Sequence, residues 1–188
     1  SNMGPLKGWK GNKFEGGHRV PFVISWTGKI PKNQKFDGLT SSLDIFSTSL
    51  AAAKIDNTTN ISLDGVSLLP YLINKKQGNP HDKLFWRKLE EAGVRVDNHK
   101  LIRLKDFGYT MYDLDQDLGE TQNLSKSNTL KLNKLIEELE QWETEMSEPL
   151  WFEEKGWMDV TYNIHKQLMQ KKKVTQKEPK GKLYSNAD

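Results

Sequence analysis

Four short apolar segments follow one another in the middle of the chain and constrain its fold more than any other feature. They are residues 84–86, 93–96, 99–104 and 110–113. Their lengths, and the turn pair Asp97-Asn98 between the second and third, are typical of strands joined by short connections. Because such short links reverse the chain between neighbours, these segments predict a four-stranded antiparallel sheet.

A helical pattern follows the sheet after a loop at 117–120. The apolar positions recur at helical spacing on one stripe: Leu132, Leu135, Ile136, Leu139, Trp142 and Met146. Charged residues fill most of the other positions, so we expect a long helix that packs its apolar stripe on one face of the sheet. Together the sheet and helix predict an α+β fold.

The first eighty residues show a different pattern. The apolar run 20–26 predicts a buried strand that ends at Thr27-Gly28, with Pro21 suited to its first position or to a sheet edge. A serine-capped helix is predicted from 41 to 53, with one apolar face, and a short helical piece from 67 to 74.

Composition excludes several classes of protein. Hydrophobic residues make up 35% of the chain, enough for a core, so we do not expect general disorder. The absence of cysteine removes disulfides, thiolate metal sites and a cysteine nucleophile. Residues 170–188 contain six lysines against one Glu and one Asp, so the tail accounts for the net charge of +3 and nucleic-acid binding by the whole domain has little support.

The histidines and the paired acidic residues do not form a metal motif. His18, His81, His99 and His165 are far apart, without metal-ligand spacing. Asp113, Asp115 and Asp117 alternate as in a calcium loop, but Leu118 and Leu124 stand where that loop needs glycine and glutamate. We therefore expect structural or surface roles for His81, His99 and His165, and a polar strand exit at 113–117.

The stretch 8–21 is the most informative for chemistry. Four glycines within ten residues bracket Lys10 and Lys13 and let a backbone approach a ligand closely. Backbone N–H groups and ammonium groups together can cradle an anion. Taken alone, the pattern leaves open either an anion site or a glycine-rich turn with solvated lysines.

The run Lys10-Gly11-x-x-Phe14-Glu15-Gly16-Gly17-x-Arg19-Val20-Pro21 resembles the second signature of the type I sulfatases, in the alkaline phosphatase superfamily. Further motifs follow in the family's order over about residues 1–150. They are Trp26-Thr27-Gly28-Lys29-Ile30, Leu43-Asp44-Ile45-Phe46-Ser47-Thr48, Asp64-Gly65-Val66-Ser67-Leu68-Leu69-Pro70, Leu84-Phe85-Trp86-Arg87, His99-Lys100-Leu101 and the stretch 112–124. Thr27 and Ser47 replace prolines of the family pattern, and His99 replaces a tryptophan.

The resemblance implies the C-terminal part of a sulfatase. Residues 1–80 would be the last part of the α/β catalytic domain, 81–169 a subdomain with the antiparallel sheet and long helix, and 170–188 a basic tail. The parent would hydrolyse sulfate esters, with sulfated carbohydrates as the usual substrates. The missing N-terminal part of the same polypeptide would be its partner, and the isolated chain would be inactive.

The cofactors that the resemblance implies lie mostly outside this chain. The family's nucleophile is a formylglycine made in a C/S-x-P-S-R motif, which this chain lacks. Its Ca²⁺ is held by acidic residues of the N-terminal part and by an Asp-Asn pair, where this chain has Asn2 and Met3. A thioether is a poor calcium ligand, so we expect either a cut at this point or a lost metal site, and no metal ligand in this chain.

One functional residue carries over. The family lysine that contacts the sulfate aligns with Lys10, for which the resemblance implies a catalytic and substrate-binding role. Lys13 is expected to be a solvated charge, Glu15 and Arg19 a structural pair that braces the turn, and His18 a weaker candidate for substrate contact.

Other interpretations stay open. A phosphoester or phosphonate hydrolase of the same superfamily would use Lys10 to bind phosphate. A binding module without enzymatic activity would hold an acidic polysaccharide on the sheet or the lysine-rich tail. No apolar run is long enough to span a membrane and the first residues lack a secretion signal, although the resemblance implies export of the parent to the periplasm or the outside of the cell.

Overall fold

The computed structural model describes residues 4–55 and 61–175, and its chain divides into two compact units. Unit 1 contains residues 1–20 and 85–188, and unit 2 contains residues 21–84. Residues 4–20 therefore pack with residues 85–175. The predicted boundary near residue 80 concerns the domains of a longer protein and stays a prediction.

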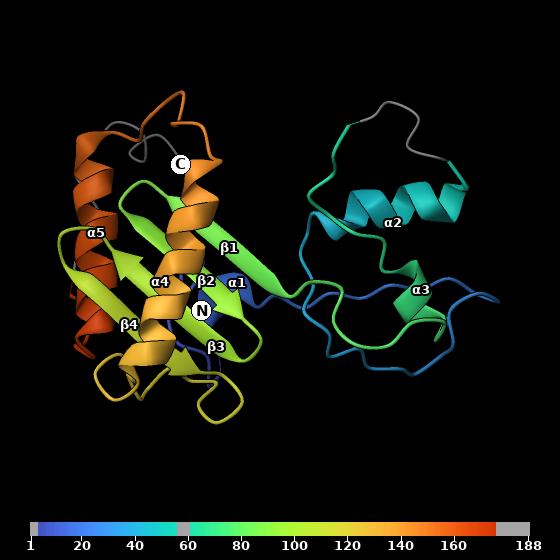
Figure 1. Ribbon diagram of the computed structural model, residues 1–188, viewed down its shortest axis with the longest axis horizontal. Helices are drawn as coiled ribbons and strands as arrows, with labels where there is room; N and C mark the ends of the chain where they lie inside the picture. The colour runs from blue at the N-terminus through green and yellow to red at the C-terminus, as the bar shows by residue number, and fades with distance from the viewer. Residues whose placement is uncertain (1–3, 56–60, 176–188) are drawn as a thin grey trace, which may run out of the picture. The chain divides into compact units, whose positions relative to one another are not determined.

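The predicted antiparallel sheet is confirmed. Its strands are β1 (Lys83–Lys88), β2 (Glu91–Val96), β3 (His99–Leu104) and β4 (Gly108–Asp113), in the spatial order β1-β2-β3-β4 (Figure 1). Leu101 is paired with Val94 on one side and with Met111 on the other. The turn between β2 and β3 falls at the predicted place, where Asp97 has a φ of 52°.

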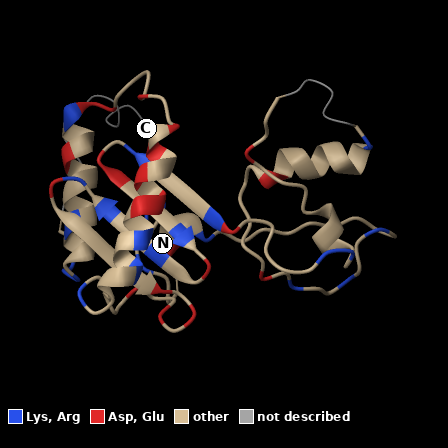
Figure 2. Ribbon diagram, viewed as in Figure 1, with Lys and Arg blue, Asp and Glu red and all other residues tan. Residues whose placement is uncertain are grey.

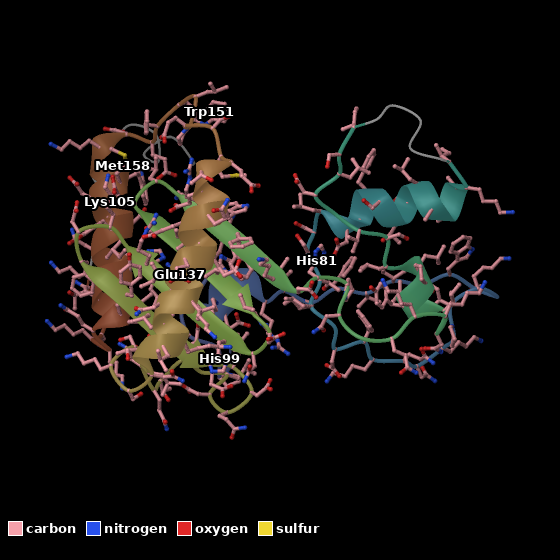
Figure 3. The ribbon with its side chains drawn as sticks, in the orientation of Figure 1. His81, His99, Lys105, Glu137, Trp151 and Met158 are labelled. Atoms are coloured by element: carbon pink, nitrogen blue, oxygen red, sulfur yellow. The ribbon has the colours of Figure 1, made fainter. Side chains whose placement is uncertain are left out.

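The long helix α4 (Thr129–Thr144) covers one face of this sheet, as predicted. Asn128 caps it, since its side chain accepts a hydrogen bond from the Lys131 amide. Buried Leu135 and Leu139 pack with Ala92, Val94, Leu101 and Met111 of the strands. Charged positions lie along the rest of α4 (Figure 2), and Glu137 lies on its exposed side (Figure 3).

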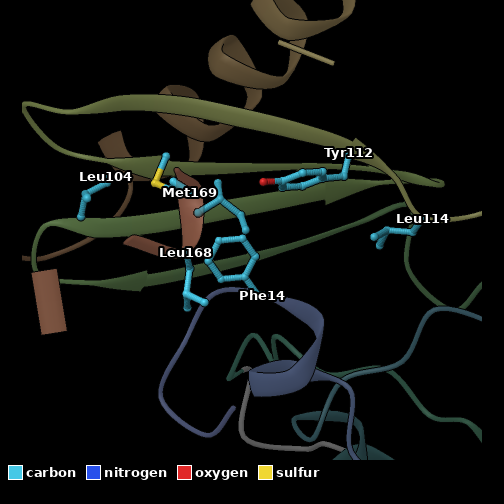
Figure 4. Close-up of a cluster of buried hydrophobic side chains, with 7 residues drawn as sticks. Phe14, Leu104, Tyr112, Leu114, Leu168 and Met169 are labelled. Atoms are coloured by element: carbon cyan, nitrogen blue, oxygen red, sulfur yellow. The ribbon is translucent and has the colours of Figure 1, made fainter. Parts of the chain in front are cut away.

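The opposite face of the sheet has two covers, and the sequence analysis did not predict either of them. One is the helix α5 (Lys155–Met169), which contacts β3, and the other is the glycine-rich N-terminal segment. Phe14 of that segment is fully buried in a cluster with Ile102, Leu104, Tyr112, Leu114, Leu168 and Met169 (Figure 4). Burial of Phe14 attaches the segment that carries Lys10 to the sheet.

Unit 2 contains two helices, α2 (Asp44–Ala53) and α3 (Leu69–Leu72), which confirm the predicted helix 41–53 and shorten the piece at 67–74. Asp44 is fully buried: Oδ2 accepts from the Ser41 amide at 2.7 Å, and Oδ1 accepts from the Val66 amide at 2.9 Å and lies 2.7 Å from His81 Nε2. This carboxylate therefore joins three segments of the unit.

The predicted buried strand at 20–26 is wrong for this structure. The run has no regular structure, and Val20 and Val23 are 68% and 87% exposed. A strand needs backbone partners on a neighbouring strand. Among the described residues, the four-stranded sheet is the only sheet, and it does not include this run. No described helix is long and apolar enough to span a membrane.

Candidate functional site

Lys10 lies at the tip of a tight turn in the N-terminal segment. Asn12 holds the turn, because its Oδ1 accepts from the Trp9 amide at 2.9 Å and its own amide donates to the Trp9 carbonyl at 3.0 Å. Lys10 is exposed, and its ammonium forms no hydrogen bond or ion pair with any described residue. A fixed backbone thus presents a cation that no described group neutralises.

Two glycines allow the short helix α1 (Glu15–His18) to pack directly on the backbone of this turn. A Cβ on Gly16 would lie 2.6 Å from the Lys7 carbonyl oxygen, and the Gly16 amide donates to that same oxygen at 2.8 Å. A Cβ on Gly17 would overlap the Asn12 carbonyl oxygen. The adjacent glycines are therefore required by close backbone approach.

A buried ion cluster of Lys100, Glu15 and Glu120 lies beneath the turn; we call it the Lys100 cluster. The Lys100 ammonium lies 2.8 Å from Glu15 Oε1 and 3.2 Å from Glu120 Oε1. Glu120 Oε2 also accepts from the Glu15 amide at 2.7 Å. Three elements meet here: β3, α1 and the loop after β4.

Burial and charge act in opposite directions on the pKa of Glu120, one of the two carboxylates of this cluster. Burial raises the pKa of Glu120, and the Lys100 charge lowers it in part. Nearby, the Lys7 ammonium donates to the Glu120 carbonyl oxygen at 3.1 Å and lies 4.5 Å from the centre of the Phe14 ring. Burial lowers the pKa of Lys7. The loop containing Glu120 is thus joined to the N-terminal segment at two points.

The expectation that Lys13 is solvated is wrong. Its side chain is 7% exposed and its ammonium lies 3.8 Å from Glu91 Oε2, while burial lowers its pKa. The Lys13 amide donates to His165 Nε2 at 3.0 Å, and His165 Nδ1 lies 2.9 Å from Glu91 Oε1. Lys13 is therefore a buried lysine that lies beside Glu91 and is not solvated.

His18 packs against an aromatic wall. Its ring stacks on Trp86 with centroids 4.3 Å apart and planes 17° from parallel. Burial, followed by the charges of Lys100 and Lys13, lowers the pKa of His18 to about 2, so the ring is neutral at ordinary pH. This geometry shows a packing role, and a substrate contact by His18 stays a prediction.

The other predicted roles are structural. Arg19 Nη1 lies 3.9 Å from Glu15 Oε2, which confirms that pair, although Lys100 is the closer partner of Glu15. His81 contacts Asp44, and His165 is fully buried. Asp113 accepts from the Asn98 side chain at 2.7 Å and from the Asp115 amide at 3.0 Å, as expected of a polar strand exit.

In the part of the chain that the structure describes, no group of three or more His, Asp or Glu side chains is arranged so that it could hold a metal ion. The predictions made for Asn2 and Met3 fall outside the described residues.

The sequence analysis missed the Lys100 cluster as a unit. One signal was present in the sequence. Lys100 alternates with Ile102 and Leu104 along the strand, so its side chain lies on the same, apolar face and was to be expected in the core. Its partners are 85 positions away in Glu15 and 20 positions away in Glu120, and no local pattern predicts that they meet.

Comparison with known proteins gives a consistent result. Residues 8–148 match the family described as N-sulphoglucosamine sulphohydrolase, C-terminal. The chain is 34% identical over 141 residues to the uncharacterized sulfatase YdeN of Escherichia coli, covering 71% of this chain and 25% of that protein. It is 40% identical over 82 residues to human steryl-sulfatase, covering 44% of this chain and 14% of the relative.

Among solved structures, the fold is similar to that of Ps i-CgsB in complex with k-i-k-neocarrahexaose. The TM-score is 0.70 at 28% identity, over 86% of this chain and 37% of the other. The chain therefore spans between a seventh and little more than a third of the length of these relatives.

Proposed function

This chain belongs to the sulfatase family, as a C-terminal region of the N-sulphoglucosamine sulphohydrolase type, and on that premise we propose that it is the C-terminal part of a sulfuric ester hydrolase. Its contribution to the reaction is Lys10. The observation that carries this proposal is an exposed ammonium without a partner among the described residues, on a turn that is fixed by buried contacts.

The chemistry follows from that placement. A sulfate ester carries negative charge on its sulfuryl oxygens, and more charge develops on the bridging oxygen as the S–O bond breaks. An ammonium carried on a fixed backbone attracts both, and its effect is largest where charge develops in the transition state. Since the turn is already ordered, little reorganisation is needed when the ester binds.

The remaining groups of the reaction would come from the rest of the polypeptide. A formylglycine would supply the nucleophile and Ca²⁺ would hold the sulfate, but neither fits this chain. It has no cysteine, and its described residues include no metal-binding cluster. The role proposed for this chain therefore includes neither the formylglycine nor Ca²⁺, and we expect the isolated chain to be inactive.

We propose a sulfated carbohydrate as the substrate class. The name of one structural relative's ligand, k-i-k-neocarrahexaose, is that of a sugar chain, and a pig relative that is 39% identical over 70 residues is named N-acetylgalactosamine-6-sulfatase. The name of human steryl-sulfatase indicates a different substrate, so a steroid sulfate is the alternative substrate class. A neutral His18 would contact such a substrate as a hydrogen-bond donor. We also propose that the parent is exported to the periplasm or the outside of the cell, where it would meet this substrate.

The test uses the full-length parent, with Lys10→Ala and Lys10→Arg assayed on aryl sulfate and on sulfated oligosaccharides. Loss of the ammonium should lower kcat/KM by about 100-fold, or about 3 kcal/mol of transition-state stabilisation. Lys134→Ala, which removes an exposed lysine from α4, is the matched control and should leave the rate unchanged.

Three results would contradict the proposal. If the parent is active and Lys10→Ala does not change its kcat/KM, the chain still belongs to the family but Lys10 is not the sulfate contact. Faster turnover of aryl phosphate than of aryl sulfate would favour the phosphoester hydrolase. Turnover by the isolated chain, with contaminants excluded, would show that the nucleophile lies within these residues.

A further inference from the structure

We propose that Lys100 is a positioning residue for Lys10: its buried ion pairs with Glu15 and Glu120 hold the turn that presents the Lys10 ammonium. The inference rests on the proposed function in one respect, since it takes Lys10 as the sulfate contact. It adds a role for a residue that does not reach the substrate.

Lys100 lies in β3, paired with Arg95 on one side and Tyr112 on the other, and its side chain is fully buried. Because β3 has a hydrogen-bonded strand on each side, its backbone has a fixed position in the sheet. That position in turn fixes the place of the carboxylates that bind the Lys100 ammonium.

A path of contacts runs from Lys100 to the turn that carries Lys10. The ammonium holds the Glu15 carboxylate, and Glu120 accepts from the Glu15 amide, so α1 is fixed at its first residue. The next amide, of Gly16, donates to the Lys7 carbonyl, and the turn from Trp9 to Asn12 closes on itself. These ion pairs and hydrogen bonds, joined by short stretches of covalent backbone, connect Lys100 to the turn.

Without the Lys100 ammonium, the two buried carboxylates lose the cation that they share. Glu15 and Glu120 are 4% and 0% exposed, and Lys100 is the cation that lies within 3.2 Å of both. Two buried carboxylates without it would repel each other or take up a proton. Either change alters the hydrogen bond between Glu120 and the Glu15 amide, and with it the support of the turn.

The same strand offers a matched control on its other face. Arg103 Nη2 lies 2.7 Å from Glu143 Oε1 and joins β3 to α4, away from the N-terminal segment. Removing that pair disturbs β3 and the packing of a helix, but none of its contacts touches residues 7–17. A general loss of stability would therefore raise hydrogen exchange throughout unit 1, whereas loss of the support of the turn would raise it at residues 7–17 in Lys100→Met alone.

The experiment compares Lys100→Met with Arg103→Met in the full-length protein by two measurements. Amide hydrogen exchange of peptides from 7–17 should rise by about tenfold or more in Lys100→Met and stay unchanged in Arg103→Met, after correction for global stability. The kinetic measurement is a double-mutant cycle with Lys10→Ala. Lys100→Met alone should lower kcat/KM by about tenfold, and in the Lys10→Ala background it should cause no further loss.

Losses that multiply in the double variant, or equal exchange in the two methionine variants, would overturn the proposal. If Lys100→Met does not fold, Glu120→Gln removes one ion pair while keeping an acceptor for the Glu15 amide, and it should show smaller changes of the same kind. If Lys10→Ala leaves activity unchanged, the proposed function fails, while hydrogen exchange at 7–17 still decides whether Lys100 supports the turn.

Discussion

The Lys100 ammonium lies 2.8 Å from the Glu15 carboxylate, although 85 positions separate the two residues in the chain. The contact joins a central strand to the glycine-rich segment that carries Lys10. Both residues are buried, so the pair is shielded from solvent and from salt. It explains how a segment with little regular structure holds one conformation at the surface of the sheet.

Gly17→Ala should destabilise unit 1 strongly. The new Cβ would overlap the Asn12 carbonyl oxygen and lie 2.9 Å from that of Trp9, and neither backbone atom can move without opening the turn. We expect a loss of about 3 kcal/mol in unfolding free energy by urea titration. Gly4→Ala is the control: its φ is +64° but its surroundings are open, so about 1 kcal/mol is expected. Equal losses would contradict the close approach.

His18 should make stability fall as the pH falls. Its pKa is lowered from 6.5 to about 2 in the folded protein, so below pH 6.5 the unfolded chain binds a proton that the folded protein excludes. Between pH 7 and pH 5 this costs about 2 kcal/mol, and His18→Phe, which keeps an aromatic ring on Trp86, should remove that component. An NMR titration of the His18 ring with a midpoint near pH 6.5 would refute the assignment.

Asp44→Ala should destabilise unit 2. The carboxylate is fully buried and accepts from the amides of Ser41 and Val66, which are left without partners when it is removed. The loss of both hydrogen bonds to part-buried amides, and of a contact at the helix end, suggests a cost of about 3 kcal/mol in thermal or urea unfolding. Asp64→Ala, at an exposed position of the same unit, should change stability by less than about 0.5 kcal/mol.

Leu139→Ala and Leu130→Ala test the packing of α4 on the sheet. Leu139 is 1% exposed in the cluster with Val94 and Leu101, whereas Leu130 is 79% exposed on the same helix. The first change should cost about 2–5 kcal/mol because it leaves a cavity, and the second less than about 0.5 kcal/mol. Comparable losses from the two variants would mean that α4 does not pack as described.

The elements of unit 1 with strong local patterns could be predicted from the sequence. Short strands with a turn pair at Asp97-Asn98, and an apolar stripe through Leu135 and Leu139, produce their structures through contacts with near neighbours. The helix α5 was not predicted, although Val160, Ile164 and Leu168 recur at helical spacing in the sequence, and only its contact with β3 depends on the tertiary structure. For the run 20–26 the opposite error was made: a strand was predicted where none forms, because high β propensity alone does not form a strand without a partner strand.

Local patterns in the sequence predict the sheet and the long helix, and a motif indicates the candidate role of Lys10, because strand length, helical spacing and a motif are all local properties. Which charges are buried depends on contacts between distant parts of the chain. Lys13 was expected to be solvated but is buried beside Glu91. Lys100 was noted only as part of a motif, but it joins two buried carboxylates. Burial and ion pairing depend on which groups the folded chain brings within a few ångströms, and Glu15, Lys100 and Glu120 meet only when the N-terminal segment packs on the sheet.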